Sequence, residues 1–252
     1  MENKNTHKNA LITHFVAGYP DMKSSLEIGR GLIEGGAAAL EIQFPFSDPS
    51  ADGPIIEFAC RQALEAGFKV QEGFNLIQSL IEESDTPVYI MSYGSILFRL
   101  GIENFILKAK SLGVKGLIIP DLIPGSDEGL YRIGREAGIE IVPVIVPTVT
   151  EERVSRIMEE KPAWIYTALR AGITGKYTTI DQSNLDFLNN LKSFKVKVMA
   201  GFGIRSKEQI ELLSPHCDAS IVGTFILESM NTAIEKKIPL KEAAHAVVKA
   251  LI

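Results

Sequence analysis

Glu41 is a single carboxylate in the run 38–44, which otherwise has the composition of a buried strand. Taking an unpaired carboxylate out of water costs on the order of several kcal/mol, and such a group commonly responds by holding a proton near neutral pH. A protonated acid inside a cleft is the reagent that general acid catalysis requires. The run therefore predicts a catalytic acid at Glu41. The alternative is a structural carboxylate satisfied by a buried hydrogen bond.

Asp52 is a second carboxylate, on the Pro- and Gly-rich stretch 45–54 that follows the same strand. Two acids in different surroundings can take different roles in one reaction, so Asp52 could work with Glu41 as a pair. The alternative is a turn residue, because Ala-Asp-Gly-Pro is ordinary turn chemistry. We predict Asp52 as the second catalytic residue, and this prediction depends on the one for Glu41.

The elements that must position these acids alternate along the whole chain. Short apolar runs predict eight strands, at 10–18, 38–44, 87–93, 116–121, 140–148, 164–169, 196–201 and 219–223. Amphipathic segments predict helices at about 22–35, 57–82 with a break near Gly67, 102–112, 126–137, 150–160, 182–192, 206–213, 225–235 and 240–251. With no linker between them, these units favour the α/β class and a single (β/α)8 TIM barrel domain over residues 1–252, with extra helices. The alternative is an open doubly wound sheet, whose Gly-x-Gly-x-x-Gly turn is missing from 14–19.

Alternate residues of a barrel strand face the interior, which places Gln43 on the same polar face as Glu41. Chemistry in this fold lies at the carboxyl ends of the strands, where further polar residues are expected to converge, namely Ser92, Asp121 and Tyr166. His14, near the end of the first strand, is a candidate substrate contact, with a packed and hydrogen-bonded side chain as the alternative. For Asp121 a structural strand-end role is the main interpretation.

Three glycine-containing turns follow the last three predicted strands, at 171–175, 201–203 and 223–224. Glycine lets backbone N–H groups approach an oxyanion closely, and Thr174 and Thr224 could add hydroxyl donors. Barrels often bind phosphate at these loops and at the amino end of a short helix. The three turns together predict a phosphate site, although any one of them could simply close a tight turn.

The composition excludes several other classes. The apolar share is 46% and the charged share 23%, and no run approaches the roughly 18 apolar residues that cross a bilayer. The polar residues 1–8 lack the apolar core of a secretory signal, which predicts a cytoplasmic protein. Cys60 and Cys217 have no metal-ligand spacing, nor do the histidines, so we expect no metal. A net charge of −5 without a basic block argues against nucleic acid and against membranes.

Residues 40–54, Leu-Glu-Ile-Gln-Phe-Pro-Phe-Ser-Asp-Pro-Ser-Ala-Asp-Gly-Pro, closely resemble the signature of the tryptophan synthase α subunit family. The resemblance extends over essentially the whole chain, through the segments 17–21, 119–122, 170–175, 201–204 and 222–224. It implies a (β/α)8 lyase of tryptophan biosynthesis that cleaves indole-3-glycerol phosphate by a retro-aldol reaction into indole and glyceraldehyde 3-phosphate, with no cofactor in this chain.

The resemblance also implies roles for single residues. Glu41 would protonate indole C3 and remove the glycerol hydroxyl proton, and Asp52 would accept the indole N–H. Tyr166 and Phe202 match pocket positions, and the lid and phosphate positions are matched by Thr174, Gly175, Gly203, Gly223 and Thr224. The family works as an α2β2 complex that passes indole to a pyridoxal-phosphate-dependent β subunit. The loop 45–54, the end of the third strand and a lid at 172–184 would communicate with that partner.

The chain departs from the family pattern at several positions, namely His14, Val16, Gln43, Ser95, Arg205 and Thr224. Gln43 stands where Gly is usual and could donate a hydrogen bond to Glu41 or narrow the pocket. These departures leave a second function open: a catalytically weakened, regulatory subunit that binds and activates a β subunit. Another phosphate-binding barrel, such as a sugar-phosphate isomerase, is disfavoured because no Lys or His stands where enolisation would need it.

Overall fold

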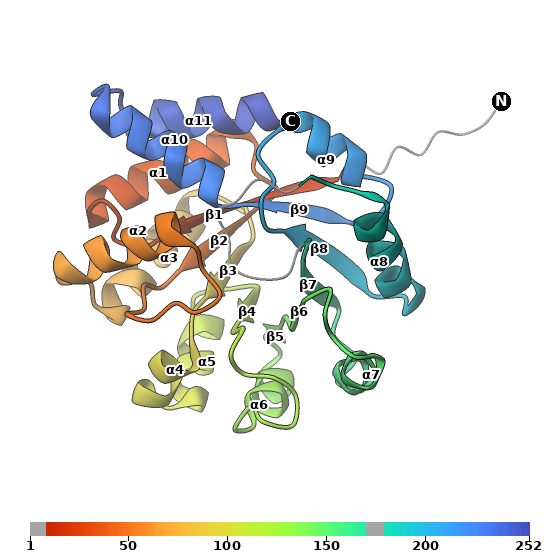
Figure 1. The fold of residues 1–252 in the computed structure, drawn as a ribbon. Coiled ribbons are helices and arrows are strands. Elements are labelled where there is room, and N and C mark those ends of the chain that lie inside the picture. Colours follow the sequence, from red (N-terminus) through yellow and green to blue (C-terminus); the bar gives the residue numbers. More distant parts are fainter. Residues whose placement is uncertain (1–8, 170–178) are drawn as a thin grey trace.

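A curled parallel sheet of nine strands forms the centre of the molecule in the computed structural model, which describes residues 9–169 and 179–252 (Figure 1). The strands are β1 (Ala10–Val16), β2 (Ala39–Gln43), β3 (Val88–Met91), β4 (Gly116–Ile118), β5 (Glu140–Ile141), β6 (Val144–Ile145), β7 (Trp164–Ala168), β8 (Lys197–Gly201) and β9 (Ala219–Val222). Their order is β5-β4-β3-β2-β1-β9-β8-β7-β6. The first strand therefore pairs with both the second and the last, as a barrel requires.

The predicted strand 140–148 is the one that the structure breaks in two. Pro143, between β5 and β6, has no N–H to donate to a ladder. Val142 N still donates to Leu117 O beyond β5 at 2.8 Å, and Pro143 O accepts from Tyr166 N of β7 at 2.9 Å. Residues 140–145 thus bond first to β4 and then to β7. This closes the ring and confirms the (β/α)8 barrel.

Helices surround the sheet on the outside (Figure 1). They are α1 (Met22–Gly35), α2 (Pro54–Glu65), α3 (Val70–Glu83), α4 (Gly94–Leu100), α5 (Ile102–Ser111), α6 (Leu130–Ala137), α7 (Glu151–Glu159), α8 (Gln182–Ser193), α9 (Lys207–Leu213), α10 (Thr224–Glu235) and α11 (Leu240–Leu251). The predicted break near Gly67 separates α2 from α3, and Gly67 has the positive φ of 90° that glycine adopts without strain. α2 begins at Pro54, three residues before the predicted start, because Pro is favourable in the first turn of a helix.

The short helix α4 was not predicted, and a distant carboxylate holds its amino end. Asp121, in the segment after β4, accepts a hydrogen bond from Gly94 N, with both carboxylate oxygens at 3.0 Å. A carboxylate at this end satisfies an N–H group that lacks an intrahelical partner and complements the helix dipole. Asp121 therefore has the structural role that the sequence favoured, and it links the segments after β3 and β4.

Two apolar layers hold the barrel together. The larger layer lies between the sheet and the helices and includes Phe15, Ile28, Leu32, Leu40, Ile42, Phe44 and Ile90. The smaller one fills the interior with side chains of the opposite strand face, among them Ile12, Ala39, Tyr89, Met91, Ile118, Met199 and Ile221. Each strand thus buries both faces, as parallel barrel strands do. Within the described residues, no helix is both long and apolar enough to span a bilayer.

Candidate active site

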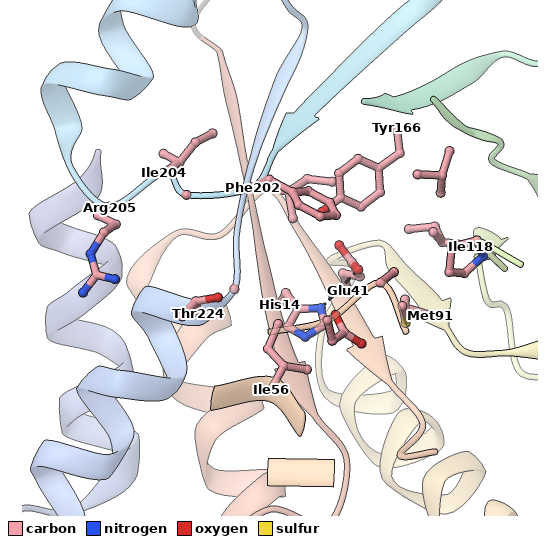
Figure 2. Close-up of a pocket in the computed structure, with 17 residues that line it drawn as sticks. His14, Glu41, Ile56, Met91, Ile118, Tyr166, Phe202, Ile204, Arg205 and Thr224 are labelled. Carbon is pink, nitrogen blue, oxygen red and sulfur yellow. Dashed lines mark hydrogen bonds and ion pairs between the residues drawn. The ribbon is translucent and has the colours of Figure 1, made fainter. Parts of the chain in front are cut away.

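A pocket lies at the carboxyl ends of the strands and encloses about 660 Å³ counting its open mouth (Figure 2). Its polar lining comes from distant segments of the chain, namely His14, Glu41, Asp52, Tyr166, Arg205 and Thr224. Its apolar lining includes Ile56, Met91, Ile118, Val144, Phe202, Ile204 and Ile221. The convergence predicted for Glu41, Asp52 and Tyr166 is therefore present. Ser92 is buried but is not among the lining residues.

Glu41 has a partner that the sequence did not reveal. The parallel register of β1 and β2 pairs His14 with Glu41, and their side chains meet with Nδ1 3.1 Å from Oε1. Glu41 is 2% exposed and His14 is 4% exposed. Among the described residues, Glu41 Oε2 and His14 Nε2 have no hydrogen-bond partner. The carboxylate is therefore not the unpaired acid that the run 38–44 predicted, but one half of a buried pair with one oxygen left for another contact.

Opposing influences act on the charge of His14. Burial lowers its pKa, because the imidazolium loses its water, while the Coulomb attraction and the hydrogen bond of Glu41 raise it, and Asp52 adds to the rise. The net direction is a pKa above the ordinary value of 6.5. The raised pKa favours the charged form of the ring, whose Nδ1 lies 3.1 Å from Oε1 of Glu41.

Asp52 is held by different partners. Gln43 Nε2 donates to its Oδ2 at 2.7 Å, and the Tyr93 hydroxyl donates to the same oxygen at 2.9 Å. Burial raises the pKa of Asp52, and His14 and these two donors partly offset the rise. Gln43 was expected to bond Glu41 or to face the substrate. Instead it is fully buried, supports Asp52 and is not among the lining residues.

Tyr93 is the member of the site that the sequence analysis missed. Its hydroxyl also accepts from Ala51 N at 3.2 Å, so it ties β3 to the loop that carries Asp52. Alternation along the third strand could have found it. Tyr89, Met91 and Tyr93 occur at every second position and all belong to the interior layer of the barrel.

Tyr166 and Phe202 form an aromatic wall of the pocket. Their rings meet edge to face, with centroids 6.0 Å apart and an interplanar angle of 67°. In Figure 2 both rings stand close to Glu41. Burial, with the nearby charges of Glu41 and Asp52, raises the pKa of Tyr166 well above its ordinary value, so the phenol stays neutral. Such a wall suits a flat apolar ring.

The other end of the pocket is bordered by the start of α10 (Figure 2). Gly203, Gly223 and Thr224 line it, and α10 begins at Thr224 without a side-chain cap at Gly223 and without an acidic residue in its first turn. The first N–H groups of a helix have no intrahelical partner and attract anions. Three of the five predicted phosphate residues thus lie together. Thr174 and Gly175 fall outside the described residues.

Arg205 lies near this end, but its charge is already paired. Its Nη1 donates to Glu228 Oε1 of α10 at 3.1 Å, and the guanidinium stacks 5.5 Å from the ring centre of Phe225. Elsewhere, the part of the chain that the structure describes contains no cluster of three or more His, Cys, Asp or Glu side chains suited to a metal ion. The absence of a metal in the working protein stays a prediction.

The chain is similar to known proteins over almost its full length. A sequence model of the family described as "Tryptophan synthase alpha chain" matches residues 1–251. The tryptophan synthase alpha chain of Helicobacter hepaticus is 39% identical over 227 residues, which cover 87% of this chain and 85% of that one. The corresponding chain of Methanosarcina barkeri is 35% identical over 245 residues, which cover 97% and 90%.

Solved structures agree with these matches. A chain of a tryptophan synthase complex from Pyrococcus furiosus has a TM-score of 0.86 at 31% identity, covering 96% of this chain and 97% of that chain. A chain of Mycobacterium tuberculosis tryptophan synthase also has a TM-score of 0.86, at 27% identity, covering 97% and 94%. The signature at 40–54, the barrel and these matches agree. The chain therefore belongs to the tryptophan synthase alpha chain family.

Proposed function

We propose that this chain cleaves indole-3-glycerol phosphate into indole and glyceraldehyde 3-phosphate by a retro-aldol reaction. Family membership supports a lyase role in tryptophan synthesis. The observation that supports the finer statement is that two buried carboxylates with different partners share one pocket with an aromatic wall and the amino end of α10. Each of these parts corresponds to one part of the substrate.

The proposed binding follows from the lining of the pocket. The indole ring would lie against Tyr166 and Phe202, and its N–H would donate to the Asp52 carboxylate. The phosphate would accept hydrogen bonds from the backbone at Gly203, Gly223 and Thr224. Because Gln43 and Tyr93 both donate to Oδ2 of Asp52, they orient Oδ1 as the oxygen that receives the indole N–H.

The proposed reaction balances within the substrate. Glu41 delivers a proton to indole C3, which converts the ring to an indolenine whose positive N–H is stabilised by Asp52. Glu41 then takes the proton of the adjacent glycerol hydroxyl. The carbon–carbon bond breaks, its electron pair restores the aromatic indole, and the hydroxyl carbon becomes the aldehyde. One proton is given and one is taken, so the proposal includes no cofactor in this chain.

Single-turnover cleavage by a Glu41→Gln variant tests this proposal. The amide has nearly the same shape but cannot transfer a proton, so we expect the rate to fall by about 10²- to 10⁴-fold with little change in substrate affinity. Glu140→Gln is the matched control, because Glu140 lies at the amino end of β5 and accepts a hydrogen bond from Trp164 N. Equal rates for Glu41→Gln and the natural chain would refute the proposed role.

A second candidate function is supported by the departures in the pocket. His14 occupies one oxygen of Glu41, and Gln43 stands at a position where the family usually has Gly. A chain altered in this way could act mainly as a regulatory subunit of an α2β2 complex with a pyridoxal-phosphate-dependent β subunit. Indole release measured with and without a β subunit distinguishes the two functions. Stimulation of the β reaction without any indole release would favour the regulatory one.

A further inference from the structure

The contact between His14 and Glu41 follows from the pairing of two adjacent barrel strands. Adjacent strands β1 and β2 present the two residues at paired positions, and both strand faces are buried there. A hydrogen bond at 3.1 Å between a buried ring and a buried carboxylate has little freedom to rearrange. The pair is therefore a fixed part of the site.

Gly223 provides the space that this ring needs. A Cβ atom at position 223 would lie 3.0 Å from His14 Cδ2 and 3.1 Å from Cγ, which is closer than side chains normally approach. The imidazole is thus held between the carboxylate of Glu41 and the backbone that begins α10. The only ring nitrogen of His14 aimed at a described polar partner is Nδ1, and that partner is Glu41.

We propose that His14 is the positioning residue of the cleavage reaction, which orients Glu41 through Nδ1 and exchanges a proton with it during each turnover. This inference rests on the function proposed above and states how Glu41 regains its proton. It assigns the proton source to a Glu41–His14 pair, where the sequence suggested a solitary acid.

The proton steps balance without any further reactant. In the resting pair the proton is on His14, and it passes from Nδ1 to the Glu41 carboxylate and then to indole C3. The hydroxyl proton of the substrate moves to Glu41 when the carbon–carbon bond breaks, and from there it returns to Nδ1. The pair ends the cycle in its starting state, and no oxidation or reduction occurs.

Among residues 9–169 and 179–252, few other titratable groups face His14. Glu41 lies on β2, Asp52 on the loop after β2 and Tyr166 on β7, and all three line the same pocket. Both carboxylates favour the charged imidazole, and the neutral amide of Gln43 favours it as well. Arg205, the cation of the pocket lining, is bonded to Glu228. A change in the pH profile on replacing His14 therefore reports on this small set of groups.

Two replacements of His14 separate orientation from proton exchange. Asn places an amide N–H near the position of Nδ1 and keeps a donor to Glu41, but it cannot titrate, whereas Leu removes both properties. For full-length chain acting on indole-3-glycerol phosphate, we expect kcat to fall about 10-fold in His14→Asn and about 100-fold in His14→Leu. We expect KM to stay within about threefold, because binding does not depend on the proton.

The pH profile gives the decisive kinetic comparison. The natural chain should lose kcat as pH rises through the pKa of His14, and in both variants this alkaline limb should move, because Glu41 then holds the proton without His14. His216→Asn is the matched control, since His216 bonds Asn189 at the surface, and it should leave the profile unchanged. An unchanged kcat and an unchanged alkaline limb in His14→Leu would overturn the inference.

A titration followed by NMR distinguishes a failure of this inference from a failure of the proposed function. The His14 ring signals, assigned by their loss in His14→Asn, should titrate at lower pH in Glu41→Gln, because the negative charge that holds the proton is gone. An unmoved His14 titration would overturn the pair even in an active chain. A natural chain that releases no indole while its His14 titration does move would instead refute the proposed cleavage.

Discussion

At the scale of the residue, the two buried carboxylates are held by different kinds of partner. Glu41 faces an imidazole, which changes charge near neutral pH, whereas Asp52 faces an amide and a phenol, which do not. Burial raises the pKa of the Tyr93 hydroxyl far above its ordinary value, so the hydroxyl keeps its proton and remains a donor. A change in pH therefore alters the partner of one acid and leaves the partners of the other unchanged.

This difference predicts how stability depends on pH. The pKa of His14 is raised in the folded state, so the folded state binds its proton more tightly than the unfolded state. The resulting stabilisation is complete below the unfolded value near 6.5 and is lost as pH rises through the folded pKa. As pH rises above about 6.5, we expect the urea midpoint of the natural chain to fall more steeply than that of His14→Asn.

Asp52 also contributes to this comparison, because His14 lowers the pKa of Asp52 and the variant lacks that effect. Its raised pKa has the same sign, since charging a buried acid costs stability as pH rises, but both proteins contain it. Parallel midpoints for the two proteins across this pH range would contradict the prediction, because they would mean that His14 titrates alike in the folded and unfolded states.

The sequence predicted the two acids and not their partners, and the reason is geometric. A lone acid in a strand and an acid in a Pro-Gly loop stand out locally. The partnership of His14 with Glu41 depends on the register between two strands, and that of Tyr93 with Asp52 on the approach of β3 to a loop. We expected Gln43 to bond Glu41, the acid nearer to it in the sequence. The loop after β2 instead folds back and places Asp52 beside the Gln43 amide.

At the scale of the element, long periodic segments were predicted well, whereas the division between β5 and β6 and the short helix α4 were not. α1 and α11 have the predicted bounds, because each carries a full apolar face. The split of β5 from β6 depends on one proline between strands with different neighbours. α4, of seven residues, is too short to show a period, and its amino end is held by Asp121 from another loop.

The cap on α4 predicts the behaviour of two variants at Asp121. Asp121→Ala removes both acceptor oxygens from Gly94 N, and we expect it to lower the free energy of unfolding by about 1 kcal/mol. Asp121→Asn keeps one acceptor and should lose less than half as much. Urea unfolding of both variants measures the difference. Equal losses would show that the hydrogen bond from Gly94 N to Asp121 is not what stabilises α4.

At the scale of the whole molecule, the last helix packs against the first. α11 packs on α1 beside α10 (Figure 1). Gly31 of α1 lies against the backbone carbonyl of Lys241, and a Cβ atom added at Gly31 would lie 2.8 Å from Ala244 Cβ. No larger side chain fits between the two helices without moving one of them. The outer layer is thus closely packed where the first and last helices meet.

This close approach predicts a loss of stability in Gly31→Ala. Alanine favours a helix over glycine by about 1 kcal/mol, but overpacking costs about 1 to 3 kcal/mol and here involves backbone that cannot rotate away. We expect a net loss of about 1 to 2 kcal/mol in urea unfolding. Ser79→Ala is the matched control and should change stability little, because Ser79 is half-buried on α3 and its hydroxyl donates to Asn75 O of the same helix. A stabilised Gly31→Ala would show that α11 packs more loosely than described.

The pairing of the first strand with the last also affects how the chain must be made. Asn9, just before β1, bonds to Ser220, 211 residues further along the chain. A ribosome adds about 5 to 20 residues per second, so one edge of β1 waits on the order of 10 to 40 seconds for β9 to emerge. An unpaired strand edge during that interval can join another nascent chain. Rapid overproduction should therefore favour aggregation, and slower synthesis or a chaperone that covers the edge should relieve it.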